Sequence, residues 1–349
     1  MSMMATSTRP VTGGVDTHKD THVAAVVDHL GGVLGTASFP NRSLAHGALL
    51  AWMRGHGAVV CVGVEGTGSY GAGLARHLRN EGVVVLEVNR PDRRTRRIHG
   101  KSDDIDAVAA AQAALAGRHA GVPKAGDGIV ESIRMLRMLR RSAVRARTQC
   151  ANQIHTLIDT APAELHDTWA KLTLNRLLEI ADHLPTPGDM AQPATSAPWA
   201  RTALAGRWHW LDDQITELDY HLDRLVPVAA PSLVTLFGVG TDTAGALLVA
   251  AGDNPDRLRS EASFAALCGV SPLPASSGRT RRHRLNRGGN REANQALWRI
   301  ALVRMAHDPT TRAYVERRTK EGLSKPEIIR CLKRYIARQV FPRLGRDLT

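Results

Sequence analysis

The first third of the sequence alternates short apolar runs with segments of helical spacing, and this order constrains the fold more than any other feature. Three β-branched or apolar runs, at 11–15, 21–27 and 32–39, follow one another closely and predict an antiparallel meander. Two continuous apolar runs, Ala58–Val64 and Val83–Val88, predict buried strands. Helical spacing at 43–54, 71–80 and 102–116 completes the order β-β-β-α-β-α-β-α.

This order is that of an α/β ribonuclease-H-like (RuvC-like) fold, in which a meander is extended by parallel strands through crossover helices. We therefore expect a first domain at residues 1–125, ending in a linker at 121–128 that contains Gly and Pro. In such a fold the first and fourth strands are neighbours.

Residues 126–228 predict a helical middle domain, with apolar positions on one face of 129–158 and near heptad spacing in 208–225. The two helices predict either a helical arm or a dimer-forming coiled coil, and a plain helical bundle is an equal alternative. The Pro-, Ala- and Thr-rich stretch 186–198 predicts a loop. Residues 229–349 predict a mainly α C-terminal domain, in which Gly238 and Gly240 lie in a segment like the hairpin of a helix-hairpin-helix unit.

The charge of the chain favours a polyanionic partner. There are 46 Lys and Arg residues against 33 Asp and Glu residues, a formal net charge of +13. Such an excess attracts nucleic acid, although a merely soluble basic protein is the alternative. Four separated cysteines without zinc-site spacing predict reduced, mostly buried thiols, and no apolar run is long enough to cross a bilayer. We expect a cytoplasmic, nucleoid-associated protein without a membrane partner.

Four carboxylates are expected to meet in the first domain. Asp16 ends the first strand, Glu65 ends the fourth, and Asp103 and Asp106 share a face at the start of the helix after the fifth strand. Converging carboxylates repel one another unless a cation neutralises them, and all-oxygen ligands suit Mg²⁺. Taken singly, Asp16 fits a turn, and Asp103 and Asp106 fit the helix dipole with Ser102 as N-cap. Together they predict a magnesium site that acts on phosphodiesters.

The motifs at both ends of the chain resemble the DEDD-type insertion-sequence transposases, a family of bridge-RNA-guided recombinases. The N-terminal stretches are GVDTHKDTH, VGVEGTGSYG, EVNRPDRRTRR and GKSDDIDAVAAA, and the C-terminal ones are TLFGVGTDTAGALLVAAGD and FAALCGVSPLPASSGRTRRHRLNRGGNREANQALWRIAL. The resemblance implies that Asp16, Glu65, Asp103 and Asp106 are the metal ligands. It also implies a nucleophilic serine before a glycine, which is Ser277, with Ser276 as the alternative. One departure is Arg287 and Gly288 where the family often has Lys before Gly-Asn.

Basic residues near these motifs predict contact with nucleic-acid phosphates. The set comprises Arg93, Arg94, Arg96, Arg97, Lys101, Arg279, Arg281, Arg282, Arg284 and Arg287, and the backbone N–H groups of Gly238 and Gly240 are expected to contact phosphates as well. A solvated face is the alternative for any such run. The same interpretation extends to the arginines of the first arm helix, namely Arg134, Arg137, Arg140, Arg141, Arg145 and Arg147.

The leading hypothesis is a transposase that cuts and rejoins donor and target DNA through a covalent phosphoserine. From the resemblance alone come a noncoding guide RNA and a homo-oligomer, dimer or tetramer, in which the metal site and the serine come from different protomers. One alternative keeps the metal site and uses water, as a junction-cleaving nuclease does. Another is a nucleic-acid-binding protein without catalysis. These patterns do not encode the target site, the guide sequence or the oligomer number, nor whether the element is active.

Overall fold

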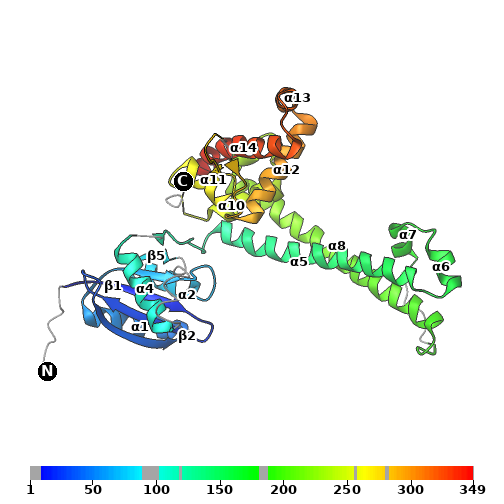
Figure 1. Cartoon of the computed structure of the whole chain (residues 1–349). Coiled ribbons are helices and arrows are strands. Elements are labelled where there is room, and N and C mark those ends of the chain that lie inside the picture. The colour runs from blue at the N-terminus through cyan, green and yellow to red at the C-terminus, as the bar shows by residue number, and fades with distance from the viewer. Residues whose placement is uncertain are drawn as a thin grey trace. The chain divides into compact units, whose positions relative to one another are not determined.

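The computed structural model describes residues 9–88, 102–117, 120–180, 188–254, 258–279 and 283–348. These residues belong to two compact units (Figure 1). The first unit comprises residues 1–128, 251–264 and the two C-terminal residues, and the second comprises 129–250 and 265–347. The boundaries at 125 and 228 that we expect from the sequence remain a prediction about three functional domains.

The first unit is built on a mixed six-stranded sheet with strand order β3-β2-β1-β4-β5-β6. Its strands are β1 (Pro10–Thr17), β2 (Thr21–Val27), β3 (Val33–Pro40), β4 (Ala58–Glu65), β5 (Val84–Val88) and β6 (Ala120–Gly121). The first three strands pair antiparallel, whereas β1–β4 and β4–β5 pair parallel. The element order and the neighbouring first and fourth strands are those that the hydrophobic pattern predicts.

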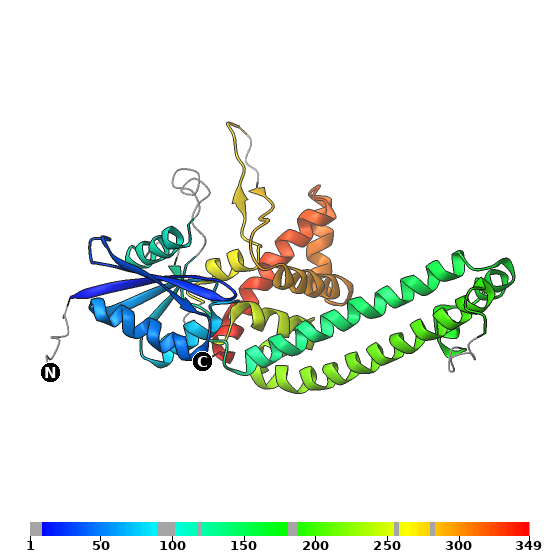
Figure 2. The same cartoon turned by 90° about the horizontal axis from the view of Figure 1, so that it is seen from below.

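Helices cover both faces of this sheet (Figure 2). One face packs against α1 (Ser43–His56) and α2 (Ala72–Asn80), and α4 (Asp103–Leu115) lies on the other. On the α1 side, Leu49, Leu50 and Met53 join strand residues such as Val15 and Val62 in a buried core. Burying this apolar surface holds the two layers together and leaves the strand ends at the sheet edge for polar residues.

Three histidines meet within the same α1–α2 layer. The ring of His22 on β2 stacks 5.8 Å from that of His46 on α1, and the His46 ring lies 6.0 Å from that of His77 on α2. His22 is fully buried. Burial, with a further contribution from His46, lowers the pKa of His22 to about 4, and burial lowers the pKa of His46. Both rings are therefore held in the neutral form inside the core.

This cluster predicts that the first unit is sensitive to acid. The folded-state pKa of His22 lies below the ordinary 6.5, so the unfolded chain binds the proton first as the pH falls. The free energy of unfolding therefore contains a contribution of about 3 kcal/mol from neutral His22. This contribution is fully present above pH 6.5 and is lost as the pH falls to about 4. Urea unfolding should show that the free energy of unfolding falls less steeply between pH 6.5 and 4 in His22→Leu than in wild type. Equal slopes would show that His22 does not carry the effect.

The second unit contains a long antiparallel helix pair. Its helices are α5 (Ile129–Asp159) and α8 (Pro193–Ala229), and the short helices α6 (Ala163–Trp169) and α7 (Leu174–Glu179) pack at the far end. The loop that the sequence predicts over 186–198 is wrong from residue 193 onward, because α8 begins there. Pro193 lies in the first turn, where a missing N–H breaks no helical hydrogen bond, and the helix continues through Pro198.

Ion pairs fix how the two long helices align. The Arg140 guanidinium donates to Asp219 at 2.9 Å, and Arg147 pairs with Asp212. The residue number of the partner on α8 decreases as that of the arginine on α5 increases, as expected for antiparallel helices. Beneath these pairs lies an apolar seam from α8, namely Leu211, Ile215, Leu218 and Leu222. The chain therefore forms a helical arm by pairing with itself.

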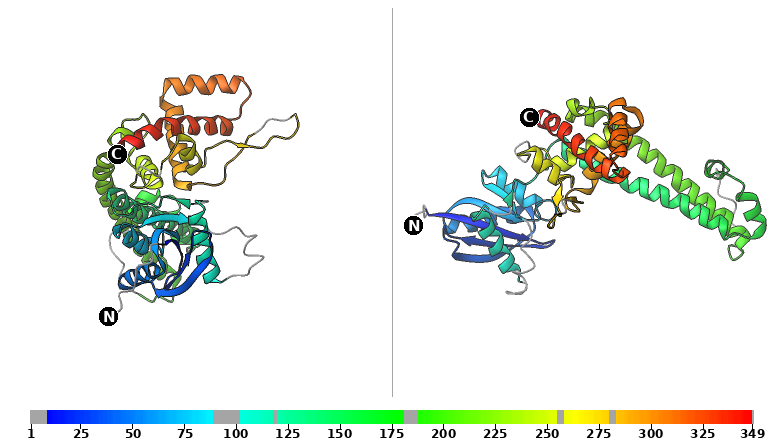
Figure 3. Two further views of the ribbon diagram at one scale, coloured as in Figure 1. Left: turned by 90° about the vertical axis from the view of Figure 1, so that its left-hand side faces the viewer. Right: turned by 45° about the horizontal axis from the view of Figure 1, so that its top comes forward.

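The rest of the second unit is mainly helical, as expected. It contains α9 (Pro231–Val234), α10 (Thr241–Ala251) up to Ala250, the end of α11 (Glu261–Leu267), β7 (Leu273–Pro274), β8 (His283–Arg284), α12 (Arg291–His307), α13 (Pro309–Lys320) and α14 (Lys325–Asp347). The Asp347 carboxylate accepts from the N–H groups of Ser232 and Leu233, at 3.0 and 2.9 Å, and so caps α9. Helix α13 lies beside α14 (Figure 3).

Two expectations from composition can be compared with these residues. All four cysteines are free, and Cys61, Cys150 and Cys268 are buried, as predicted for reduced thiols. Among the described helices, none combines the length and the apolar character that a membrane crossing needs.

Candidate functional site

Asp16 and Glu65 lie at one edge of the central sheet. Val15 and Val64 are register partners in the parallel β1–β4 ladder, so the next residues, Asp16 and Glu65, follow each other side by side. The Thr17 hydroxyl donates to the backbone carbonyl of Glu65 at 2.7 Å and ties the two strand ends together. Both acidic residues are buried, with 6% and 9% of their surface exposed.

Helix α4 brings the other two carboxylates to this edge by lying directly on the sheet. Gly14 and Gly63 are register partners beneath it. A Cβ at Gly14 would lie 2.1 Å from the Ala111 nitrogen, and one at Gly63 would lie 2.5 Å from the Ala110 oxygen. Side chains two residues apart on a strand share a face, so Asp16 and Glu65 point to the α4 side as well. The first turn of α4, with Asp103 and Asp106, lies at the same edge.

His18 completes the cluster and was not predicted as a site residue. Its Nε2 lies 3.1 Å from the Asp16 Oδ2 and 3.4 Å from the Asp103 Oδ1. Ligand atoms of Asp16, His18 and Asp103 all lie within 4.8 Å of one another. The sequence signal was the turn directly after β1, where a histidine two residues beyond the strand-end aspartate can fold back onto it.

The carboxylates act on one another electrostatically. Burial is the main cause that raises the pKa of Asp16, His18 lowers it, and Asp106 and Asp103 raise it further. Asp106 is itself buried, whereas Asp103 lies at the solvent-facing rim. Asp106 and Glu65 share the edge but do not belong to the group of three ligand atoms within 4.8 Å among the described residues.

The chemistry of these side chains fits a divalent cation. Several buried carboxylates that disfavour each other's ionisation are stabilised when a cation neutralises them. The alternative role of Ser102 as a side-chain N-cap is not observed, since its hydroxyl makes no capping hydrogen bond to α4. An imidazole among oxygen ligands broadens the set of cations to Mn²⁺ and softer ions beside Mg²⁺.

The close packing of α4 can be tested with alanine substitutions. Gly14→Ala and Gly63→Ala each place a methyl group against the α4 backbone, which must shift. We expect each to lower the free energy of unfolding by about 2 kcal/mol or more. Gly55→Ala is the control, since it lies in α1 with no atom within 4 Å of its added Cβ, and helix propensity should make it neutral or stabilising. Wild-type stability in both sheet variants would show that α4 does not press on these glycines.

A metal titration tests the carboxylate cluster. Mg²⁺ or Mn²⁺ should raise the thermal unfolding temperature of wild type, with a stabilisation of about 3 kcal/mol near a hundredfold excess over Kd. Asp16→Asn should remove this response and, because it removes a buried charge, should be at least as stable as wild type without metal. Asp104→Asn, on the exposed side of α4, is the matched control and should respond normally. An unchanged response in Asp16→Asn would exclude a cation at this edge.

The predicted serine follows strand β7 of a hairpin in the second unit. Strands β7 and β8 pair antiparallel through Leu273–Arg284 and Pro274–His283, and the hairpin projects from the helices (Figure 2). Ser276 and Ser277 lie beyond β7 and are exposed, and Gly278 has a positive φ of 54°. Within the described ranges, neither hydroxyl takes part in a hydrogen bond.

The glycine-rich segment after the hairpin has a structural role. Gly289 has a φ of 87°, and a Cβ there would lie 2.6 Å from the Gly269 nitrogen. Asn290 then caps α12 by accepting from the N–H groups of Glu292 and Ala293. Arg287, which stands before this segment, is exposed. The Gly-Asn pair that carries part of the family resemblance therefore anchors the hairpin to the helical body.

The predicted phosphate contacts divide into several groups. Arg279, Arg284 and Arg287 lie on or next to the hairpin and are exposed. Gly238 has a φ of 79°, and the N–H of Gly240 already donates to the Thr243 hydroxyl at 3.1 Å, so a phosphate contact there remains a prediction. Outside the described residues lie Arg93, Arg94, Arg96, Arg97, Lys101, Arg281 and Arg282.

Most arginines of the arm are paired with carboxylates of their own unit. Besides the two pairs with α8, Arg137 donates to Asp242 at 2.6 Å, and Arg141 pairs with Glu292. Arg134 pairs with Glu131 at 2.7 Å. The Arg134–Glu131 pair lies within α5, whereas the other four pairs hold α5 against α8, α10 and α12. The charges thus have a structural role that the sequence pattern did not indicate.

Comparisons with known proteins match two segments of the chain to transposases. A family model described as "Transposase", of the DEDD type, matches residues 13–161, and one described as "Transposase IS116/IS110/IS902 family" matches residues 230–316. A relative from Streptomyces coelicolor, the "Insertion element IS110 uncharacterized 43.6 kDa protein", is 32% identical over 116 residues. That match covers 33% of this chain and 28% of the relative.

The fold and the acidic edge thus lie in a segment that matches a transposase family. More narrowly, the chain is a member of the DEDD-type IS116/IS110/IS902 family, since the two family models match it in order and together cover about two thirds of its length. The first model includes Asp16, Glu65, Asp103 and Asp106, and the second includes Ser277.

Proposed function

We propose that this protein is an insertion-sequence transposase that cuts and rejoins donor and target DNA. The observation that carries the proposal is the convergence of Asp16, His18 and Asp103 at the sheet edge, with Glu65 and Asp106 buried beside them, inside the segment that matches a DEDD-type transposase. The strand order supports a ribonuclease-H-like (RuvC-like) assignment for this unit.

In this proposal the acidic edge is the site of phosphodiester activation. Asp16, Glu65, Asp103 and Asp106 would hold Mg²⁺, with buried carboxylates from Asp16, Glu65 and Asp106 and an exposed one from Asp103. A divalent cation there offsets the negative charge on a phosphodiester and lowers the proton affinity of an attacking hydroxyl. His18 positions the carboxylates of Asp16 and Asp103 through its two contacts.

Ser277 is the proposed nucleophile. Its Oγ forms a bond to phosphorus as the bond from phosphorus to one strand breaks, and that strand leaves with a free hydroxyl after taking up a proton. The phosphoserine ester retains the bond energy, so a hydroxyl of a second strand can attack it, release the serine and rejoin the DNA without ATP. Its exposed position beyond β7, two residues before the exposed Arg279, is suited to meeting a phosphate.

The partners follow from family membership. We infer a noncoding guide RNA, a homo-oligomer that is a dimer or tetramer, and action at the nucleoid in the cytoplasm. The glycine turn at 238–240, of which Gly240 is exposed, would form the hairpin of a helix-hairpin-helix contact with DNA.

The serine assignment is tested by trapping covalent protein–DNA adducts. Purified protein is incubated with Mg²⁺, guide RNA, and donor and target DNA, then denatured and resolved by gel electrophoresis. Wild type should give a protein-linked DNA band and recombinant product. Ser277→Ala should lose both, by at least a thousandfold in rate for a missing nucleophile, while binding DNA normally. Ser276→Ala is the matched control and should retain both.

Other outcomes identify the alternatives. Free cut ends without adducts in wild type would indicate a nuclease that uses water. Adducts that persist in both serine variants would show that another residue is the nucleophile. DNA binding with no cleavage, unchanged in Asp16→Asn and Glu65→Gln, would indicate a binding protein without catalysis.

A further inference from the structure

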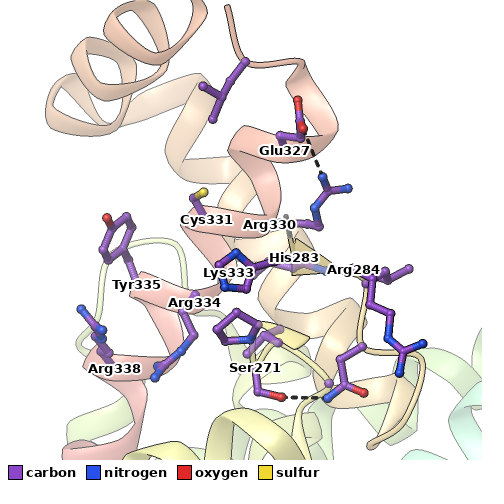
Figure 4. Close-up of a pocket in the computed structure, with 16 residues that line it drawn as sticks. Ser271, His283, Arg284, Glu327, Arg330, Cys331, Lys333, Arg334, Tyr335 and Arg338 are labelled. Atoms are coloured by element: carbon purple, nitrogen blue, oxygen red, sulfur yellow. Dashed lines mark hydrogen bonds and ion pairs between the residues drawn. The ribbon is translucent and has the colours of Figure 1, made fainter. Parts of the chain in front are cut away.

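A large basic cavity lies between the base of the serine hairpin and helix α14 (Figure 4). Its volume is about 750 Å³. One wall is formed by residues on either side of the hairpin, including Ser271 and Arg284, and the other by successive turns of α14. Ser271 accepts a hydrogen bond from the Asn286 side chain at 2.9 Å, which closes the base of the hairpin next to the cavity.

The lining is strongly cationic. The lining contains a single carboxylate, that of Glu327, and five Lys and Arg side chains, namely Arg284, Arg330, Lys333, Arg334 and Arg338. On α14, Arg330, Arg334 and Arg338 recur every four residues and so form one stripe along the helix. Lys333 is buried and donates to the Asn294 side chain at 2.9 Å. A stripe of this kind has the spacing to follow the phosphates of a nucleic-acid strand.

Tyr335 adds an aromatic surface to the same lining. About half of this residue, 48%, is exposed. The Arg338 guanidinium lies 5.8 Å from its ring centroid, and the Tyr314 ring on α13 meets it edge-on at 5.8 Å. The edge-on contact holds the ring in place, and about half of the residue remains exposed to an incoming base. An aromatic ring flanked by arginines is the arrangement that binds unpaired bases.

We propose that this cavity takes one unstacked nucleotide of a single strand, with its base on Tyr335 and its flanking phosphates on the arginines of α14 and Arg284. The volume lies in the range of pockets for small molecules of nucleotide size. A duplex presents stacked bases that cannot enter it, so the site selects a strand that is open. The inference rests on the proposed action on nucleic acid and adds a subsite for a single strand at the root of the serine hairpin.

The test compares two strands that differ only in their bases. Fluorescence anisotropy measures binding of the full chain to a labelled oligothymidine of about ten residues and to an abasic strand of the same length. Wild type should bind the thymidine strand about tenfold more tightly, since stacking of one base on an aromatic side chain is worth about that factor. Tyr335→Ala should lose this preference and keep the affinity for the abasic strand, and Tyr335→Phe should keep both.

The matched control is Tyr220→Ala, which removes an exposed tyrosine on α8 that also carries an arginine over its ring but lies outside the cavity. It should leave the preference unchanged. Arg338→Ala should weaken the binding of both strands and reduce the slope of log affinity against log salt by about 0.7. Arg207→Ala, which removes an exposed arginine on α8, should change neither quantity.

The outcomes separate this inference from the proposed function. A preference for bases that survives in Tyr335→Ala overturns the cavity as the base site, even if the protein recombines DNA. Equal affinity of wild type for the two strands does the same. Oligouridine in place of oligothymidine distinguishes RNA from DNA as the source of the strand. Absence of any binding to DNA or RNA contradicts the proposed function itself.

Discussion

The contact between the α4 backbone and two paired glycines is the constraint on which the acidic edge depends. Gly14 and Gly63 are direct neighbours in the β1–β4 ladder, and neither leaves space for a Cβ beneath Ala110 and Ala111. The helix therefore lies closer to the sheet than a side chain at either position would allow. Only then can its first turn bring carboxylates to within reach of Asp16. Local close packing thus produces an electrostatic conflict, which a cation can relieve.

Much of this could be predicted because strand and helix periodicities are local properties. The runs ending at Asp16 and Glu65 and the amphipathic start of α4 gave the sheet order and the convergence of three chain segments. His18 could not be predicted as a partner, because its orientation depends on where α4 places Asp103. The start of α8 was missed because a Pro-rich stretch predicts a loop, whereas Pro193 is tolerated in the first turn and the helix continues through Pro198.

The basic residues of the chain have two distinct roles, structural ion pairs and the lining of a cavity, and the net charge does not distinguish them. On the arm, arginines meet aspartates of α8 and α10 that lie many residues away, so the sequence alone showed the cations without their partners. Around the hairpin and α14, cations line a cavity and greatly outnumber the carboxylates there. A charge run is therefore informative about binding only once the location of the opposite charges is known.

The arm has a repeat that makes its length adjustable. Arg140 and Arg147 are seven residues apart on α5, and their partners Asp219 and Asp212 are seven residues apart on α8. Adding or removing seven residues in both helices would preserve the seam and the ion pairs while changing the reach of the arm by about 10 Å. Insertions or deletions of whole heptads can thus change the span of the arm without altering the structure at either of its ends.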